Sequence, residues 1–339
     1  MAVRMKDVAQ SLGVSIVTVS KALKNHPDIA KATRERVMAK IKELNYRPNL
    51  MARSLVTGRS SLVGLIVPDL IHPFFSEIAK SLSSALRKKD FFLLVASSES
   101  DAVLEDAEIE HMLAHRLDAL VVATTQSTSE KLRKVSENGP PLILLDRDFQ
   151  DFRSNFLGSN DYKVGELATE HLIAIGRKKI AHIRGPENRV GKSRFEGYRD
   201  TLERHGVAID PRYVIAPLGS VDVDGRTRGE TAMKNLLSLK MRPDAVFCFN
   251  DMIASGAIMA ALDAGLKIPR DLAVIGCGNY HYDELLRVPL STIDQRIEPL
   301  GLRTAKMIFR LVEAEGPIRP QRVILEPELV VRESSRVVK

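Results

Sequence analysis

Apolar residues near the start of the chain recur with the spacing of short helices. Two helices joined by a tight turn are predicted within residues 5–23. Gly13 interrupts the apolar pattern, and a glycine there can adopt the left-handed conformation that ends one helix and directs the next. Ser15 follows as a candidate N-cap for the second helix. The predicted buried faces are Val8, Ala9 and Leu12 in the first helix and Val19, Ala22 and Leu23 in the second.

The spacing across this turn is typical of a DNA-binding helix-turn-helix. The small Ala9 is followed by Gly13 four positions later and by the aliphatic Val19 six positions after that. An ordinary helical hairpin can show the same spacing, so spacing alone leaves both interpretations open. A third helix is predicted over 31–45, because Val37, Ile41 and Leu44 form an apolar stripe.

A short helix of about two turns is expected from Asn49 to Leu55. Such a helix is marginal alone, so we expect it to become ordered only against a partner. Residues 57–61, rich in Gly and Ser, are typical of a flexible linker.

From Leu62 onward, β-branched runs alternate with helical segments. Such runs indicate parallel sheets that are covered on both faces, and therefore an α/β fold. The βα units are too numerous for one sheet of ordinary size, and a second cycle begins near residue 160, so we expect two similar lobes with a cleft between them. Ligands in such folds bind at the carboxyl ends of strands. The corresponding segments are 68–69, 146–147, 185–186, 250–251 and 278–279.

The net charge of +7 is unevenly distributed along the 339 residues. Residues 1–60 contain twelve Lys and Arg against four acidic residues, a net charge of +8, which leaves −1 for the remainder. A basic module on a nearly neutral body fits a partner with a phosphate backbone.

Several other classes of protein are not indicated by the sequence. The two cysteines, Cys248 and Cys277, lie in apolar runs and are expected to be small buried side chains. Residues 185–193 resemble a phosphate-binding loop but have five residues between the glycines instead of four. His111 and His115 have metal-ligand spacing without a third ligand nearby, and we expect no metal, no cofactor and no enzymatic activity. No signal peptide or membrane-length apolar run is recognisable, so a cytoplasmic protein is expected.

In its motifs the sequence resembles the LacI family of bacterial transcription regulators over residues 4 to about 335. The matching stretches are 6–9, 13–15, 18–20, 33–35, 44–49, 52–55, 194–198, 242–245, 250–251 and 329–334. The resemblance implies a helix-turn-helix head over 1–48, a hinge helix and linker over 49–61, and a two-lobed effector domain over 62–339 that is similar to periplasmic sugar-binding proteins. It places lobe one at about 62–161 and 293–320 and lobe two at about 162–292 and 321–339. The run from Arg322 to Val331 is then expected to return to lobe two.

The resemblance also implies how the protein would contact DNA. A homodimeric repressor would bind a pseudo-palindromic double-stranded operator. Tetrameric members of the family end in an additional leucine-heptad helix, and the sequence shows no such repeat, so a dimer is expected. Leu55 would enter the minor groove as an apolar wedge, although packing of Leu55 on the body is an alternative. The expected base contacts are Ile16, Val17, Lys21 and Leu55, and the expected backbone contacts are Ser15, Thr18, Ser20, Asn49 and Arg53.

For the effector cleft the resemblance implies aromatic and polar contacts. The expected effector-binding residues are Phe74, Phe75, Asp146, Arg194, Asn250 and Gln295. These side chains suit a sugar, a sugar derivative or a heterocycle. Gly278 stands where many members carry an aspartate that binds sugar hydroxyls, so anionic effectors also stay open. A solute-binding protein without a DNA role is the alternative function, and the basic head argues against it.

Overall fold

The computed structural model describes residues 3–23, 25–46, 59–216, 224–316 and 318–336. These residues form two compact units, residues 1–60 and residues 61–339. The expected hinge residues Asn49, Arg53 and Leu55 lie outside the described residues. None of the described helices combines the length and the apolar character that crossing a bilayer requires.

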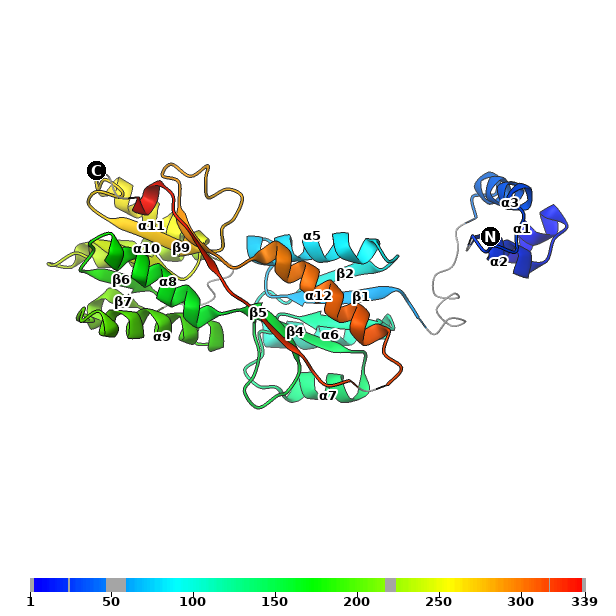
Figure 1. The fold of residues 1–339 in the computed structure, drawn as a ribbon, viewed down its shortest axis with the longest axis horizontal. Helices are drawn as coiled ribbons and strands as arrows, with labels where there is room; N and C mark the ends of the chain where they lie inside the picture. Colours follow the sequence, from blue (N-terminus) through cyan, green and yellow to red (C-terminus); the bar gives the residue numbers. More distant parts are fainter. Residues whose placement is uncertain (1–2, 24, 47–58, 217–223, 317, 337–339) are drawn as a thin grey trace. The chain divides into compact units, whose positions relative to one another are not determined.

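The first unit is a bundle of three helices (Figure 1): α1 (Met5–Leu12), α2 (Ile16–Leu23) and α3 (Lys31–Glu43). Its core is small and forms where the three helices meet. The buried members are Val8, Ala9, Val19, Ala22, Val37 and Tyr46. Leu12, Leu23, Ile41 and Leu44 pack against this core while remaining partly exposed. The apolar periodicity therefore predicted the helices and their buried faces correctly.

The second unit begins with a six-stranded sheet in the order β11-β5-β4-β3-β1-β2, in which every pair is parallel. Its strands are β1 (Leu62–Val67), β2 (Phe92–Ser97), β3 (Ala119–Val122), β4 (Leu142–Leu145), β5 (Asn155–Ser159) and β11 (Arg322–Leu325). Helices α5 (Pro73–Arg87) and α12 (Ile297–Val312) cover one face with one hydrophobic core. Helices α6 (Ala102–Ala114) and α7 (Glu130–Asn138) cover the other face. We call this sheet and its helices lobe one.

A second six-stranded sheet has the order β12-β10-β9-β8-β6-β7 and is parallel except for the pair β10–β12. Its strands are β6 (Ile180–Ile183), β7 (Val214–Ile215), β8 (Ala245–Cys248), β9 (Ala273–Cys277), β10 (Ser291–Asp294) and β12 (Glu328–Val330). Helices α8 (Asp161–Ala174) and α9 (Arg189–Arg204) cover one face, and α10 (Gly225–Ser238) and α11 (Asp251–Asp263) cover the other. Short 3-10 turns lie at Pro211–Tyr213 and Glu333–Ser335. This is lobe two.

The chain passes between the two sheets three times, and two boundaries differ from the expected ones (Figure 1). Strand β10 pairs with β9 through Ile293, so the sheet of lobe two continues past residue 292. Strand β11 pairs with β5 of lobe one, whereas residues 321–339 were expected in lobe two. Of the two late strands, only β12 joins lobe two, where it pairs with β10. The late apolar run is thus divided between both sheets, with the crossing between Leu325 and Glu328.

The helix pairs of lobe two approach one another through glycines. A Cβ at Gly229 of α10 would lie 2.0 Å from the carbonyl oxygen of Ile253, and one at Gly256 of α11 would lie 1.9 Å from that of Arg226. Gly165 and Gly197 have the same relationship in α8 and α9. Only glycine allows backbones to pack this closely. These glycines therefore determine how closely the two helices on each face of the sheet pack against one another.

Candidate functional site

The turn between α1 and α2 is built as the sequence predicts. Gly13 has a φ of 65°, in the left-handed region, and its N–H donates to the carbonyl oxygens of Ala9 and Gln10. The hydroxyl of Ser15 accepts a hydrogen bond from the N–H of Thr18 at 3.0 Å, so Ser15 caps α2. The hydroxyls of Ser15 and Thr18 also lie 2.9 Å apart. The two side chains therefore form a polar group at the first turn of α2, where open N–H groups favour anions.

The first residues of α2 present apolar side chains to solvent. Ile16 is 50% exposed and Val17 is 63% exposed, whereas Val19 on the opposite side is completely buried. Neither exposed residue belongs to the core of the bundle. Large aliphatic side chains at the start of an exposed helix suit contact with thymine methyl groups in a major groove.

Lys21 is held by an ion pair that the sequence analysis did not foresee. Its Nζ lies 2.8 Å from Oδ2 of Asp28, and Nδ1 of His26 lies 3.3 Å from the same oxygen. The hydrogen bond from Lys21, together with the nearby charges of His26 and Lys21, lowers the pKa of Asp28. Asp28 therefore remains ionised and draws the Lys21 ammonium group towards the end of α2. Ser20, on the same helix, is partly exposed.

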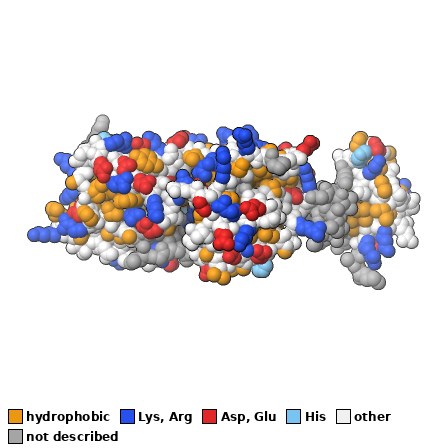
Figure 2. Space-filling view, turned by 90° about the horizontal axis from the view of Figure 1, so that it is seen from below, with side chains coloured by type: hydrophobic (Ala, Val, Ile, Leu, Met, Phe, Trp, Pro, Cys, Tyr) orange, Lys and Arg blue, Asp and Glu red, His pale blue; other side chains and the backbone are white. Residues whose placement is uncertain are grey.

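Charge on the second unit is mixed. Figure 2 shows basic and acidic side chains interspersed over the visible face of residues 61–339, with no large area of one sign. This agrees with the net charge of −1 beyond residue 60. The basic excess of the chain is therefore a property of its first sixty residues.

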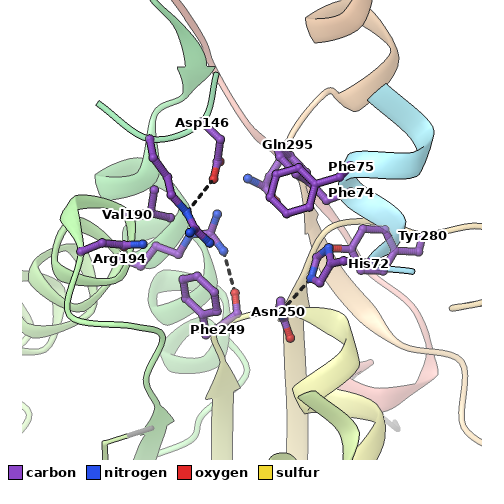
Figure 3. Close-up of a pocket in the computed structure, with 12 residues that line it drawn as sticks. His72, Phe74, Phe75, Asp146, Val190, Arg194, Phe249, Asn250, Tyr280 and Gln295 are labelled. Carbon is purple, nitrogen blue, oxygen red and sulfur yellow. Dashed lines mark hydrogen bonds and ion pairs between the residues drawn. The ribbon is translucent and has the colours of Figure 1, made fainter. Parts of the chain in front are cut away.

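All six side chains that were expected to contact an effector line one cavity in the second unit (Figure 3). They come from both lobes and from the segments at the carboxyl ends of strands. The complete lining is His72, Phe74, Phe75, Asp146, Arg147, Asn188, Val190, Arg194, Phe249, Asn250, Tyr280 and Gln295. The cavity has a volume of about 30 Å³, enough for one or two water molecules. A larger ligand therefore requires the lobes to separate or the lining side chains to move.

Arg194 is the central cation of this cavity. It is only 3% exposed, and its Nε donates to Asp161 Oδ1 at 2.9 Å. Its Nη1 donates to the carbonyl oxygen of Phe249 at 2.7 Å, and its guanidinium carbon lies 4.4 Å from the centre of the Phe249 ring. Burial raises the pKa of Asp161, and the ion pair with Arg194 opposes this effect. These contacts leave part of the guanidinium group facing the cavity in a fixed orientation.

Asp146 and Arg147 directly follow β4, and the side chain of Asp146 lies near Arg194 (Figure 3). Asp146 has a φ of 63°, in the left-handed region, which turns the chain sharply after the strand. Nε of Arg147 lies 3.8 Å from Oδ2 of Asp146, and Nη1 of Arg147 donates to the carbonyl oxygen of Thr124 at 3.4 Å. The cavity therefore contains one carboxylate and two guanidinium groups, which can bind hydroxyl or carboxylate oxygens of a ligand.

A segment of lobe two reaches across to lobe one beside the cavity. Tyr280 follows β9, yet its ring is buried in the core that contains Phe74 and Phe75. A Cβ at Gly278 would lie 2.4 Å from Cζ of Tyr280 and 2.8 Å from Oδ2 of Asp251. The tyrosine ring and the carboxylate therefore occupy the space that a side chain at position 278 would need. An acidic side chain at position 278 would therefore clash with both groups.

The segment is anchored by a buried pair of carboxyl groups, Asp251 and Asp283, which are both fully buried. Asp251 accepts hydrogen bonds from the N–H of Asn279 at 2.7 Å and from the hydroxyl of Thr292 at 2.8 Å. Burial raises the pKa of both carboxyls, and for Asp283 the neighbouring charge of Asp251 adds to the effect. A proton shared by the pair fits this arrangement, since two buried carboxylates cannot both be ionised cheaply.

Six lining residues were missed by the sequence analysis. They are His72, Arg147, Asn188, Val190, Phe249 and Tyr280. His72 and Asn188 are the N-cap residues of α5 and α9, and Phe249 directly follows strand β8, so positions at helix starts and strand ends were a usable signal. Arg147 was noted only as part of the strand-end segment 146–147. Tyr280 carried no local signal, because nothing in its own segment indicates insertion into the opposite lobe.

Both cysteines are buried and free. Burial raises the pKa of the Cys248 and Cys277 thiols well above its usual range. They are therefore small apolar packing groups, as the sequence suggested.

Comparison with known proteins agrees with both units. Residues 4–49 match the model of the bacterial regulatory proteins of the lacI family, and residues 60–327 match that of the periplasmic binding proteins and sugar binding domain of the LacI family. The chain is 31% identical over 333 residues to the HTH-type transcriptional regulator DegA of Bacillus subtilis, covering 97% of each chain. It is 33% identical over 335 residues to the ribose operon repressor of Escherichia coli, covering 98% of this chain and 99% of the relative.

A solved structure of similar architecture is the lac repressor dimer bound to operator and the anti-inducer ONPF. It has a TM-score of 0.86 and 25% sequence identity, and the match covers 99% of each chain. The exposed recognition helix and the cleft between two α/β lobes therefore occur together in proteins that regulate transcription. The chain belongs to the LacI family of bacterial transcription regulators: it is a DNA-binding regulator, not an enzyme, whose second unit binds a small-molecule effector.

Proposed function

We propose that the protein is a homodimeric repressor that binds a pseudo-palindromic operator and is located with the nucleoid in the cytoplasm. Ile16 and Val17 press on thymine methyl groups, and Lys21 donates to a guanine. Ser15, Thr18 and Ser20, with Asn49 and Arg53 of the expected hinge helix, contact phosphates. The exposure of Ile16 and Val17 supports this assignment most directly, because two aliphatic side chains are kept in solvent although the core has no need of them.

Leu55 acts in the proposal as the wedge that kinks the centre of the operator, once from each protomer. A Leu55→Ala variant should lose operator affinity while keeping its affinity for unrelated DNA, because the wedge stabilises only the kinked complex. Fluorescence anisotropy with operator and scrambled duplexes at several salt concentrations measures both. Equal losses on the two duplexes would refute the wedge.

Salt dependence tests the DNA role as a whole. Each neutralised phosphate contributes about −0.9 to the slope of log K against log salt. A steep slope for promoter DNA from the protein's own genomic neighbourhood, together with a preference for one sequence, is the expected result. If binding is absent or unselective with and without candidate effectors, the proposed operator binding is wrong, and a solute-binding protein without a DNA role becomes the better interpretation.

The effector proposed for the cleft is a sugar or a sugar derivative. Asp146, Arg194, Asn250 and Gln295 supply acceptors and donors for hydroxyl groups, and Phe74 and Phe75 supply an aromatic wall. The ring centres of the two phenylalanines lie 5.1 Å apart at an interplanar angle of 82°, so they form a corner instead of a flat shelf. One relative is named for ribose, and a related solved structure is a complex of CelR with cellobiose.

A thermal-shift screen of pentoses, hexoses, sugar phosphates and nucleobases identifies the class, because a ligand that binds only the folded state raises its apparent stability. The Arg194→Gln variant should lose the shift that the best ligand gives. The matched variant Arg204→Gln, on the exposed end of the same helix, should retain it. If no sugar or sugar derivative shifts the melting temperature while a nucleobase does, the proposed class is wrong.

A further inference from the structure

A second hollow lies beside the junction of the lobes and shares no lining residue with the effector cavity. It has a volume of about 470 Å³. Its walls are the connection between β4 and β5, the first residue of α9 and the first residue of β11. The lining residues are Phe149, Gln150, Asp151, Phe152, Arg153, Ser154, Arg189 and Arg322.

Three guanidinium groups face this hollow with too little negative charge to balance them. Nη1 of Arg189 and Nη1 of Arg322 both donate to the same oxygen of Asp148, at 3.1 and 2.6 Å. Asp148 is buried, with its side chain only 2% exposed, so one carboxylate is shared by two arginines. Arg153 is exposed and has no acidic partner among the described residues.

The acidic residue on the wall, Asp151, does not neutralise this excess. Its Oδ2 accepts a hydrogen bond from the hydroxyl of Ser129 at 2.8 Å and lies 3.3 Å from Nη2 of Arg133. Arg133 comes from α7 and is not part of the lining. The charge of Asp151 is therefore already balanced from outside, and the hollow remains positive.

An independent observation points to a ligand at the same place. The hydroxyl of Ser154 is buried without a hydrogen-bond partner, and the residue is only 4% exposed. Ser154 lies in the wall of the hollow, next to Arg153. A buried hydroxyl normally has a partner, and a ligand oxygen in the hollow would supply one.

We propose that this hollow is a binding site for phosphate, either as the inorganic anion or as the phosphoryl group of a phosphorylated metabolite. Arginine forks match the oxygens of a phosphoryl group and can bind them in pairs. Ser154 donates its hydroxyl proton to a further oxygen. Arg189 belongs to lobe two, whereas Arg153 and Arg322 belong to lobe one, so the bound anion holds the two lobes together.

Isothermal titration of the full-length protein with sodium phosphate, at an ionic strength kept constant with sodium chloride, tests the site. Arg153→Gln should weaken phosphate binding about tenfold or more, because a charge-assisted hydrogen bond is lost, and Ser154→Ala should weaken it about threefold to tenfold. Arg287→Gln, an exposed arginine in lobe two, is the matched control and should bind as the parent does. Binding that is absent, or equally affected by Arg153→Gln and the control, overturns the proposal.

Two further titrations identify the source of the anion. If inorganic phosphate binds as tightly as glucose 6-phosphate and both depend on Arg153, the free anion is the ligand. If glucose 6-phosphate binds more tightly and depends on Arg153, a phosphorylated metabolite is the ligand. If glucose 6-phosphate and glucose bind alike and neither depends on Arg153, both occupy the effector cavity and the proposed site is refuted.

Discussion

The side-chain amide of Asn250 donates a hydrogen bond to Nε2 of His72, at 3.3 Å, across the cleft between the lobes (Figure 3). Asn250 caps α11, since its Oδ1 accepts from the N–H of Ile253 at 2.9 Å. That contact orients the amide, so its nitrogen faces His72 and can only donate. Nε2 of His72 must then be the acceptor, and the histidine carries its proton on Nδ1. His72 is itself the N-cap residue of α5, so the starts of two helices are joined.

This contact predicts the effect of replacing His72 by phenylalanine. The ring contacts with Phe75 and Tyr280 can persist, but the acceptor for the Asn250 amide is lost. The contact between the two lobes should weaken by about 1 kcal/mol, which is about fivefold in the equilibrium between lobes in contact and lobes apart. Hydrogen–deuterium exchange should accelerate in peptides that contain residues 72–78 and 249–254. The exposed His111→Phe change on α6 is the control, and equal exchange in both variants would contradict a role for the contact.

The buried pair of Asp251 and Asp283 predicts an alkaline loss of stability. Burial raises the pKa of both carboxyls above the unfolded value of about 4, so the folded state holds a proton that the unfolded state releases. The stabilisation is complete below that value and decreases as the pH rises towards the folded pKa. Arg332 acts in the opposite direction by favouring the ionised forms.

Asp283→Asn removes the titrating proton while an amide can still donate to Asp251. We therefore expect the melting temperature of the parent to fall between pH 5 and pH 9 and that of the variant to fall less. At the alkaline end, the loss in free energy of unfolding should be about 1–3 kcal/mol larger for the parent than for the variant. Calorimetry across this range measures it. Asp263→Asn, an exposed change in α11, should follow the parent, and parallel curves for all three proteins would exclude the pair as the cause.

The close packing of α10 on α11 predicts that Gly256→Ala is destabilising. The added methyl group would lie 1.9 Å from the carbonyl oxygen of Arg226, so the helices must move apart. The expected cost is about 1–3 kcal/mol, measured by chemical denaturation. At Gly316 a Cβ meets nothing within 4 Å, so Gly316→Ala should be neutral. A Gly256→Ala protein as stable as the Gly316→Ala protein would show that the helices can adapt.

The ion pair between Lys21 and Asp28 predicts a change in DNA discrimination. Asp28→Asn releases the Lys21 ammonium group and removes a negative charge from the basic head, so affinity for unrelated DNA should rise at low salt. Discrimination of the operator should fall by up to about fivefold, because an exposed pair contributes at most about 1 kcal/mol to holding Lys21 in place. Glu43→Gln breaks the ion pair with Lys40 on α3 and changes the charge equally, which makes it the control. An identical response of the two variants would show that only the change in net charge matters and that the ion pair does not position Lys21.

Local features of the chain were readable from the sequence. Gly13, the Ser15 cap and the apolar faces of the first three helices follow from rules that act within a few residues, and the structure confirms them. The alternation of β-branched runs and helices likewise predicted two parallel sheets with helices on both faces. The six residues expected around the effector were identified by resemblance to a family, and they do line one cavity.

Tertiary structure alone decided which distant segments meet. Strand β11 pairs with β5, more than 160 residues earlier, and its own apolar pattern fits either sheet equally well. Tyr280 is buried in lobe one, and Asp28 holds Lys21, although neither residue has a local pattern that indicates its partner. The physical reason is that periodicity records which face of a segment must be buried. The surface that covers this face is selected by the packing of the whole chain.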